Sequence, residues 1–141
     1  MVALVLYIKK GTQMKNEIVI GGVSYTLRFG LGFLREINKR VQMPLDGAPT
    51  IKNNIGLKYT VGRMMDGSVE DLIDIIYLAN KNENPRLTMA TIDEWIEDPE
   101  TDIDEVFDEV MDFLRTANAT RKEVAALEEA AAEQRIETKN E

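Results

Sequence analysis

Cysteine and histidine are both absent from the 141-residue chain. Without them the sequence contains no thiolate or imidazole metal ligand, no cysteine nucleophile and no histidine base. Disulfide bonds are impossible, so we expect an intracellular protein. Carboxylates, lysine, tyrosine and hydroxyl groups are the side chains that remain for catalysis, and this set favours a protein that is not an enzyme.

Basic residues are absent from the stretch Leu87 to Leu114, which holds 11 carboxylates. The net charge is -8, but residues 1–60 carry 9 Lys/Arg against 3 Asp/Glu, and residues 61–141 carry 8 against 22. Such a field repels nucleic acid and anionic lipid, and attracts basic protein surfaces. A solvated acidic helix face explains the same charges, and the two interpretations are compatible. We expect no nucleic-acid partner and no membrane partner.

Long hydrophobic runs are also missing, since a membrane-spanning helix needs about 20 apolar residues. The apolar run Val2 to Ile8 has seven, with neither the preceding basic residues nor the cleavage site of a signal peptide. Met14 looks like a more natural beginning of the domain. Residues 1–13 are therefore predicted to be an N-terminal extension, a cloning remnant or an extra strand.

A glycine pair, Gly21-Gly22, separates two β-rich runs near the start of the chain. Glycine accepts the positive φ angles of a two-residue hairpin turn, so the pair predicts a β-hairpin. Apolar and polar residues alternate after the turn, which is typical of a half-buried strand. The apolar positions are Val23, Tyr25, Leu27 and Phe29.

Apolar side chains at helical spacing predict several helices after the hairpin. The first runs from about Phe33 to Val41, and the segment Pro44 to Pro49 then predicts a loop. A second helix covers about 57–65. Ser68 is a good N-cap for a core helix, and Thr91 opens the capping box of a shorter one.

A last ordered helix is predicted from Thr101 or Asp102, with a wide apolar stripe and an acidic opposite face. The stripe either completes the core or binds a partner; the candidate partner-binding residues are Ile103, Phe107, Val110, Met111 and Leu114. Residues 117–141 are Ala/Glu-rich and predict a helical or disordered tail. The sequence thus predicts a mainly helical α+β fold, with the hairpin packed on a bundle of about four to five helices within residues 14–116.

The acidic segment Asp98 to Glu109 has the ligand spacing of an EF-hand calcium loop. Ile103, however, stands where that loop needs glycine, and acids that cap a helix explain the same pattern, so we expect no metal. Gly30-Leu-Gly lacks the further residues of a phosphate-binding loop, so we expect no nucleotide cofactor. A hydrolase would need two acids in differently tuned pockets, which clustered acids disfavour.

The stretch Lys15 to Arg40 resembles the tail assembly chaperones of long-tailed phages and prophages of Gram-positive bacteria. In that family a hairpin of the form I-gly-G-x-x-Y-x-L-x-F-G runs into a helix of the form hyd-x-F-hyd-R-E-hyd. Beyond Arg40 the likeness is architectural only. The matching residues are Ile20, Gly22, Tyr25, Leu27, Phe29, Gly30, Phe33, Arg35, Glu36 and Ile37.

This resemblance implies a non-enzymatic chaperone in the host bacterial cytoplasm. It would coat the helical tape measure protein, self-associate, and be left out of the virion. The family often makes a longer form by ribosomal frameshifting, through which the tail tube protein would be recruited; Thr138-Lys139-Asn140 is compatible with a slippery codon run. The alternative is an acidic protein-binding adaptor or a minor structural phage protein.

Overall fold

The N-terminal hairpin forms where the glycine pair predicts it. In the computed structural model, which describes residues 16–140 and side chains up to residue 136, β1 (Asn16–Ile20) pairs antiparallel with β2 (Val23–Leu27). Gly21 and Gly22 form the turn, with φ of +57° and +79°, angles that strain residues with a Cβ. Residues 1–13, predicted as an extension, lie outside the described residues.

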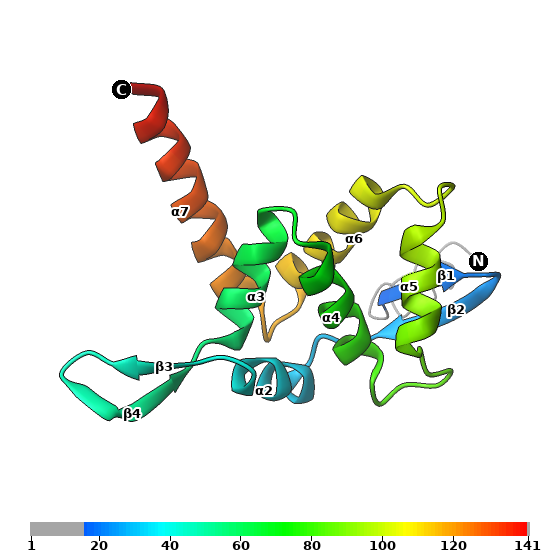
Figure 1. Ribbon diagram of the computed structural model, residues 1–141, viewed down its shortest axis with the longest axis horizontal. Helices are drawn as coiled ribbons and strands as arrows, with labels where there is room; N and C mark the ends of the chain where they lie inside the picture. The colour runs from blue at the N-terminus through cyan, green and yellow to red at the C-terminus, as the bar shows by residue number, and fades with distance from the viewer. Residues whose placement is uncertain (1–15, 141) are drawn as a thin grey trace, which may run out of the picture.

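Six helices follow the hairpin within the described part of the chain (Figure 1), so the fold is α+β and mainly helical, as predicted. None of the helices formed by residues 16–140 has the length and hydropathy needed to cross a bilayer. The helices are α2 (Leu31–Lys39), α3 (Gly56–Met65), α4 (Val69–Asn80), α5 (Met89–Glu97), α6 (Ile103–Thr116) and α7 (Arg121–Asn140).

Helix α4 is the centre of the core and contacts α2, α3, α5, α6 and β2. Its apolar side chains Leu72, Ile75 and Ile76 are completely buried. The Ser68 side chain accepts the backbone N–H of Asp71, which satisfies one of the free amides in the first turn. Both the core helix and its cap are confirmed.

Helices α2 and α3 approach each other closely at Gly56. A Cβ built on Gly56 would lie 1.6 Å from the backbone oxygen of Ile37, so only glycine fits there. The side chain of Asn38 accepts the backbone N–H of Leu57 at 2.9 Å and thereby caps α3 from the neighbouring helix. The two helices are therefore joined by backbone contact as well as by side chains.

A second hairpin replaces the loop that was expected around Pro44 and Pro49. Strands β3 (Gln42–Leu45) and β4 (Ala48–Asn54) pair antiparallel across Asp46-Gly47, and Gly47 has φ +79°. Figure 1 shows this ribbon projecting away from the helices. The loop prediction was wrong because it treated Pro44 and Pro49 as interruptions of regular structure and did not use the turn-forming pair Asp46-Gly47 between them. Proline is tolerated in an exposed strand.

The start of α6 was placed correctly and that of α5 was not. Asp102 Oδ1 accepts the backbone N–H of Glu105, which confirms the predicted helix start. In α5, Thr88 rather than Thr91 is the N-cap, and its Oγ1 accepts the backbone N–H of Thr91 at 3.2 Å. The sequence holds a threonine at both positions, and either one satisfies the side-chain preference for a cap.

Helix α7 packs against α3 and α6. Val124 is completely buried there, and the Thr120 hydroxyl donates to the backbone oxygen of Leu114 at 2.6 Å. The rest of α7 extends away from the body of the molecule (Figure 1). The division into a domain of residues 14–116 and a tail of residues 117–141 stays a prediction.

Candidate partner-binding groove

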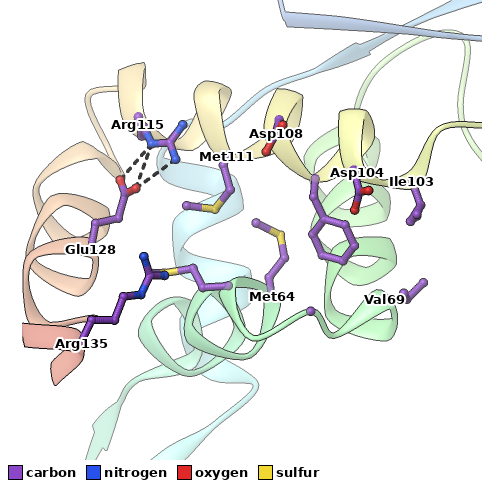
Figure 2. Close-up of a pocket in the computed structure, with 12 residues that line it drawn as sticks. Met64, Val69, Ile103, Asp104, Asp108, Met111, Arg115, Glu128 and Arg135 are labelled. Carbon is purple, nitrogen blue, oxygen red and sulfur yellow. Dashed lines mark hydrogen bonds and ion pairs between the residues drawn. The ribbon is translucent and has the colours of Figure 1, made fainter. Parts of the chain in front are cut away.

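A groove lies between α6 on one side and α3 with the start of α4 on the other, and α7 borders one end of it (Figure 2). Its volume is about 710 Å³. Apolar side chains form its floor: Met64, Met65, Val69, Ile103, Phe107 and Met111. Charged side chains form its rim: Asp104, Asp108, Arg115, Glu128 and Arg135.

The floor combines three methionines with a phenylalanine. Met64 is 1% exposed and Met111 is 8% exposed, while Met65 and Phe107 are half-buried. Unbranched methionine side chains adapt to different surfaces, which suits a site that receives side chains from another molecule. Met65, Ile103 and Phe107 are the floor side chains of α3 and α6 that keep accessible surface, with the buried Met64 and Met111 beneath them.

Helix α6 divides the predicted partner-binding residues between two faces. Ile103, Phe107 and Met111 are spaced four residues apart and line the groove. Val110 and Leu114 are completely buried in the core and do not line it. The stripe thus divides between the groove and the core, because its width exceeds the single row of side chains that one helix face presents, and binding of a partner by these residues stays a prediction.

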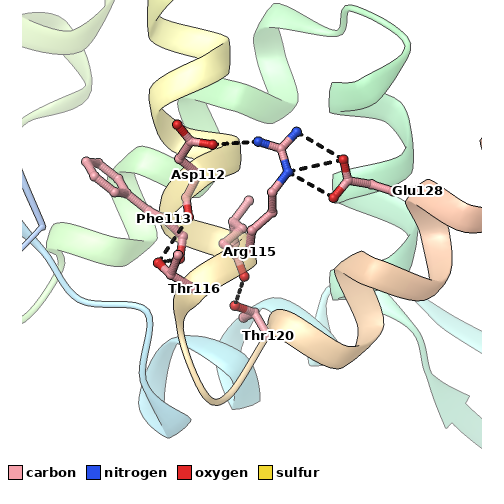
Figure 3. Close-up of polar contacts among 7 residues, drawn as sticks. Asp112, Phe113, Arg115, Thr116, Thr120 and Glu128 are labelled. Atoms are coloured by element: carbon pink, nitrogen blue, oxygen red, sulfur yellow. Dashed lines mark hydrogen bonds and ion pairs between the residues drawn. The ribbon is translucent and has the colours of Figure 1, made fainter.

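Arg115 ties α7 to α6 at the rim. Its Nε donates to Glu128 Oε1 at 2.9 Å, and its Nη1 donates to Asp112 Oδ1 at 2.6 Å (Figure 3). The hydrogen bond to Glu128 is the main cause that raises the pKa of Arg115 above its usual range, so the guanidinium stays charged. This contact helps to fix the position of α7 beside the groove.

Comparison with known families identifies the family of the chain. The model of the family described as "Phage tail assembly chaperone protein, TAC" matches residues 17–129, which include β1 from its second residue, every element from β2 to α6, and the part of α7 that holds Glu128. The chain belongs to this family of phage tail assembly chaperones. No curated protein and no solved structure gave a significant match.

The family motif of the chaperone supports the fold and does not line the groove. Phe29 and Phe33 form an edge-to-face pair with ring centroids 5.1 Å apart, and Glu36 Oε1 forms an ion pair with Lys81 at 2.9 Å. Gly22 and Gly30 stand at the hairpin turn and at the N-cap of α2. The other motif positions are Ile20, Leu27 and Ile37, which are buried, Tyr25, which is half-buried, and Arg35, which is exposed.

Several groove residues of the chaperone were not identified from the sequence. Met64 and Met65 were predicted only as part of the helix at about 57–65, and Glu128 and Arg135 only as part of the tail of residues 117–141. A pair of adjacent methionines beside a helix end was the one available signal. The contribution of α7 depends on how it packs after residue 120, which no local pattern specifies.

The acids of the EF-hand-like segment form turn and helix caps in the chaperone. Asp98 Oδ1 accepts the backbone N–H of Glu100 at 2.9 Å, and Asp102 caps α6. From Ile103 onward the chain is helical, where a calcium loop would still be turning. Within the described residues no group of three or more Asp or Glu side chains is placed to hold a metal ion.

Proposed function

We propose that the chaperone binds a helical segment of the tape measure protein in the groove between α3 and α6. The observation that carries this proposal is the methionine-rich floor, which is bordered by charges and lies beside α6. The lining residues of α6 run from Ile103 to Arg115, which corresponds to roughly 18 Å, or about three helical turns. An amphipathic partner helix would place its apolar stripe along this length.

We further propose that the chaperone acts by binding alone and catalyses no reaction. The acids beside the groove, Asp104 and Asp108, are exposed side chains of one helix. A pair of catalytic carboxylates needs two environments that separate their pKa values. Two solvated acids one turn apart share nearly the same environment, which supports an electrostatic role.

The remaining steps of tail assembly are proposed from the family. The chaperone would act in the host cytoplasm, self-associate along the tape measure protein, and reach the tail tube protein through a longer, frameshifted form. Mass spectrometry of purified virions tests whether it leaves before the particle is complete. The chaperone should be absent; a stoichiometric amount would favour a minor structural protein instead.

Co-expression with the tape measure protein tests the groove directly. Phe107→Asp places a charge on the half-buried floor and should leave the tape measure protein insoluble and unbound, because burying an unpaired carboxylate is costly. Ile51→Asp is the matched control, since Ile51 is 54% exposed on β4 and lies outside the groove. The control should keep the tape measure protein soluble.

The Phe107 variant must be folded for this comparison, so its circular dichroism and melting are measured alongside. Ile103→Asp at the end of the groove provides a second variant if Phe107→Asp unfolds. A folded groove variant that still co-purifies with the tape measure protein as efficiently as the wild type would contradict the proposal.

A further inference from the structure

The charges along the groove are ordered. Asp104, Asp108 and Arg115 all line it from α6, at positions that are four and seven residues apart and so share one face of the helix. Figure 2 shows Asp104 toward one end, Asp108 near the middle, and Arg115 at the other end, where Arg135 extends from α7. One end of the groove is therefore acidic and the other carries arginines.

Within the described residues, neither aspartate is compensated by an ion pair. Their neighbours in the groove at that end are Val69 and Ile103, which are uncharged. At the opposite end Arg115 is paired with both Glu128 and Asp112, so these charges, together with Arg135, add up to zero. The charge along the groove thus changes from negative to neutral over the length of α6.

We propose that the groove selects an amphipathic helix whose charges are segregated along its length. Its basic end lies over Asp104 and Asp108, and its acidic or neutral end lies beside Arg115 and Arg135. Two Lys or Arg residues four positions apart match the two aspartates, because that spacing repeats the one on α6. This inference rests on the proposed binding of a helix in this groove, and specifies which helices fit.

The charges affect which helix binds in the groove more than they affect the overall affinity for an amphipathic helix. Exposed ion pairs contribute little individually, and apolar contact with the floor supplies most of the binding. Two matched pairs should change the dissociation constant by roughly three- to tenfold at low salt, and the difference should shrink as salt screens the pairs.

Two helical peptides of about 14 residues test this inference. They share one composition and one apolar stripe, but one carries its lysines at one end and its glutamates at the other, and the second interleaves them. Fluorescence anisotropy with the full chain should give tighter binding of the segregated peptide. Equal dissociation constants, or no binding of either peptide, would overturn the inference.

Matched variants assign the preference to the groove. Asp104→Asn/Asp108→Asn should remove the preference for the segregated peptide. Asp93→Asn/Glu97→Gln removes two exposed acids four residues apart on α5, outside the groove, and should retain it. An equal loss in both variants would indicate general charge attraction and would contradict an ordered groove.

Disulfide cross-linking determines the orientation of the bound peptide in the groove. The chain has no cysteine of its own, so each introduced cysteine is the single reactive thiol of the chaperone. A cysteine at the lysine end of the peptide should cross-link to Val69→Cys and not to Arg135→Cys; the reverse result would overturn the inference. If the groove prefers the segregated peptide but the chaperone does not bind the tape measure protein on co-expression, only the proposed function is refuted. If the chaperone binds the tape measure protein, Phe107→Asp abolishes that binding, and the two peptides bind equally, only the inference about charge order is refuted.

Discussion

At the scale of single residues, Asn80 is the most connected polar side chain in the interior. It is completely buried; its Nδ2 donates to the backbone oxygens of Thr26 and Pro85, and its Oδ1 accepts the N–H of Leu87. These bonds join β2, the end of α4 and the segment before α5. The side chain therefore connects the segment that follows α4 to β2, where Thr26 lies 54 residues before Asn80 in the sequence.

Asn80→Ala should lower the free energy of unfolding by about 2–4 kcal/mol, because it leaves one buried N–H and two carbonyl groups without their partner. Chemical denaturation measures the change. Asn82→Ala, at an exposed position two residues later, is the control and should change stability by less than about 0.5 kcal/mol. Equal effects would show that Asn80 does not act through its hydrogen bonds.

Glu109 predicts a pH dependence. Partial burial, and then the charge of Glu105 one turn earlier, raise the pKa of Glu109 above its usual range. The folded state thus favours the protonated carboxyl, and stability is lost as pH rises from the unfolded-state pKa through the raised one. Glu109→Gln should therefore raise the melting temperature slightly at neutral pH and have no such effect below roughly pH 4.

Thermal melts of wild type and Glu109→Gln across this pH range measure the difference. Exposed Glu133 on α7, outside the acidic segment, provides the control, since Glu133→Gln should not reproduce the pH-dependent gain. A gain for Glu109→Gln that stays constant down to low pH would contradict the assignment to its ionisation.

At the scale of elements, the helices with strong apolar periodicity and side-chain caps could be predicted from the sequence. The second hairpin was missed although Asp46-Gly47 is a favourable two-residue turn, because β3 and β4 have almost no buried face and so no alternating pattern. The groove could not be predicted. Its floor is formed by α3 and α6 together. In the sequence Phe107 and Val110 belong to one continuous apolar stripe, and only the packing of the helices places Phe107 in the groove and Val110 in the core.

Helix α7 depends on a small number of contacts, of which the Arg115–Glu128 pair is the outermost described ion pair. Glu128→Gln should increase amide hydrogen exchange in residues 121–136 by roughly two- to fivefold, because a partly exposed ion pair contributes less than about 1 kcal/mol. Exchange in α4 should be unchanged.

Mass spectrometry of the exchanged protein measures this effect. The exposed neighbour Glu129 supplies the control, because Glu129→Gln removes the same charge from α7 without contacting Arg115. If both variants exchange alike, the pair does not hold α7 in place.

At the scale of the whole molecule, charge is concentrated on one part of the structure. The 11 carboxylates between Leu87 and Leu114 fall on α5, α6 and their connection, and no Lys or Arg lies among them. Repulsion among these acids destabilises the folded chain, and salt screens it. The concentration of acids that was expected to attract a basic partner therefore also weakens the free protein.

Raising NaCl from about 10 to about 200 mM should increase the melting temperature by a few degrees. Asp93→Asn/Glu97→Gln should reduce this increase, because it removes two of the repelling charges. Glu17→Gln/Glu133→Gln removes the same number of charges outside the acidic segment and serves as the control. A melting temperature that falls with salt would show that ion pairs outweigh the repulsion.

The projecting β3–β4 ribbon has one further consequence. A two-stranded ribbon has two open edges, and unpaired edges invite strand addition from aggregating chains. Pro44 in β3 and Pro49 in β4 each lack a backbone N–H, and Lys52 adds a charge that must stay hydrated. We expect these residues to limit strand addition at the two exposed edges of the ribbon.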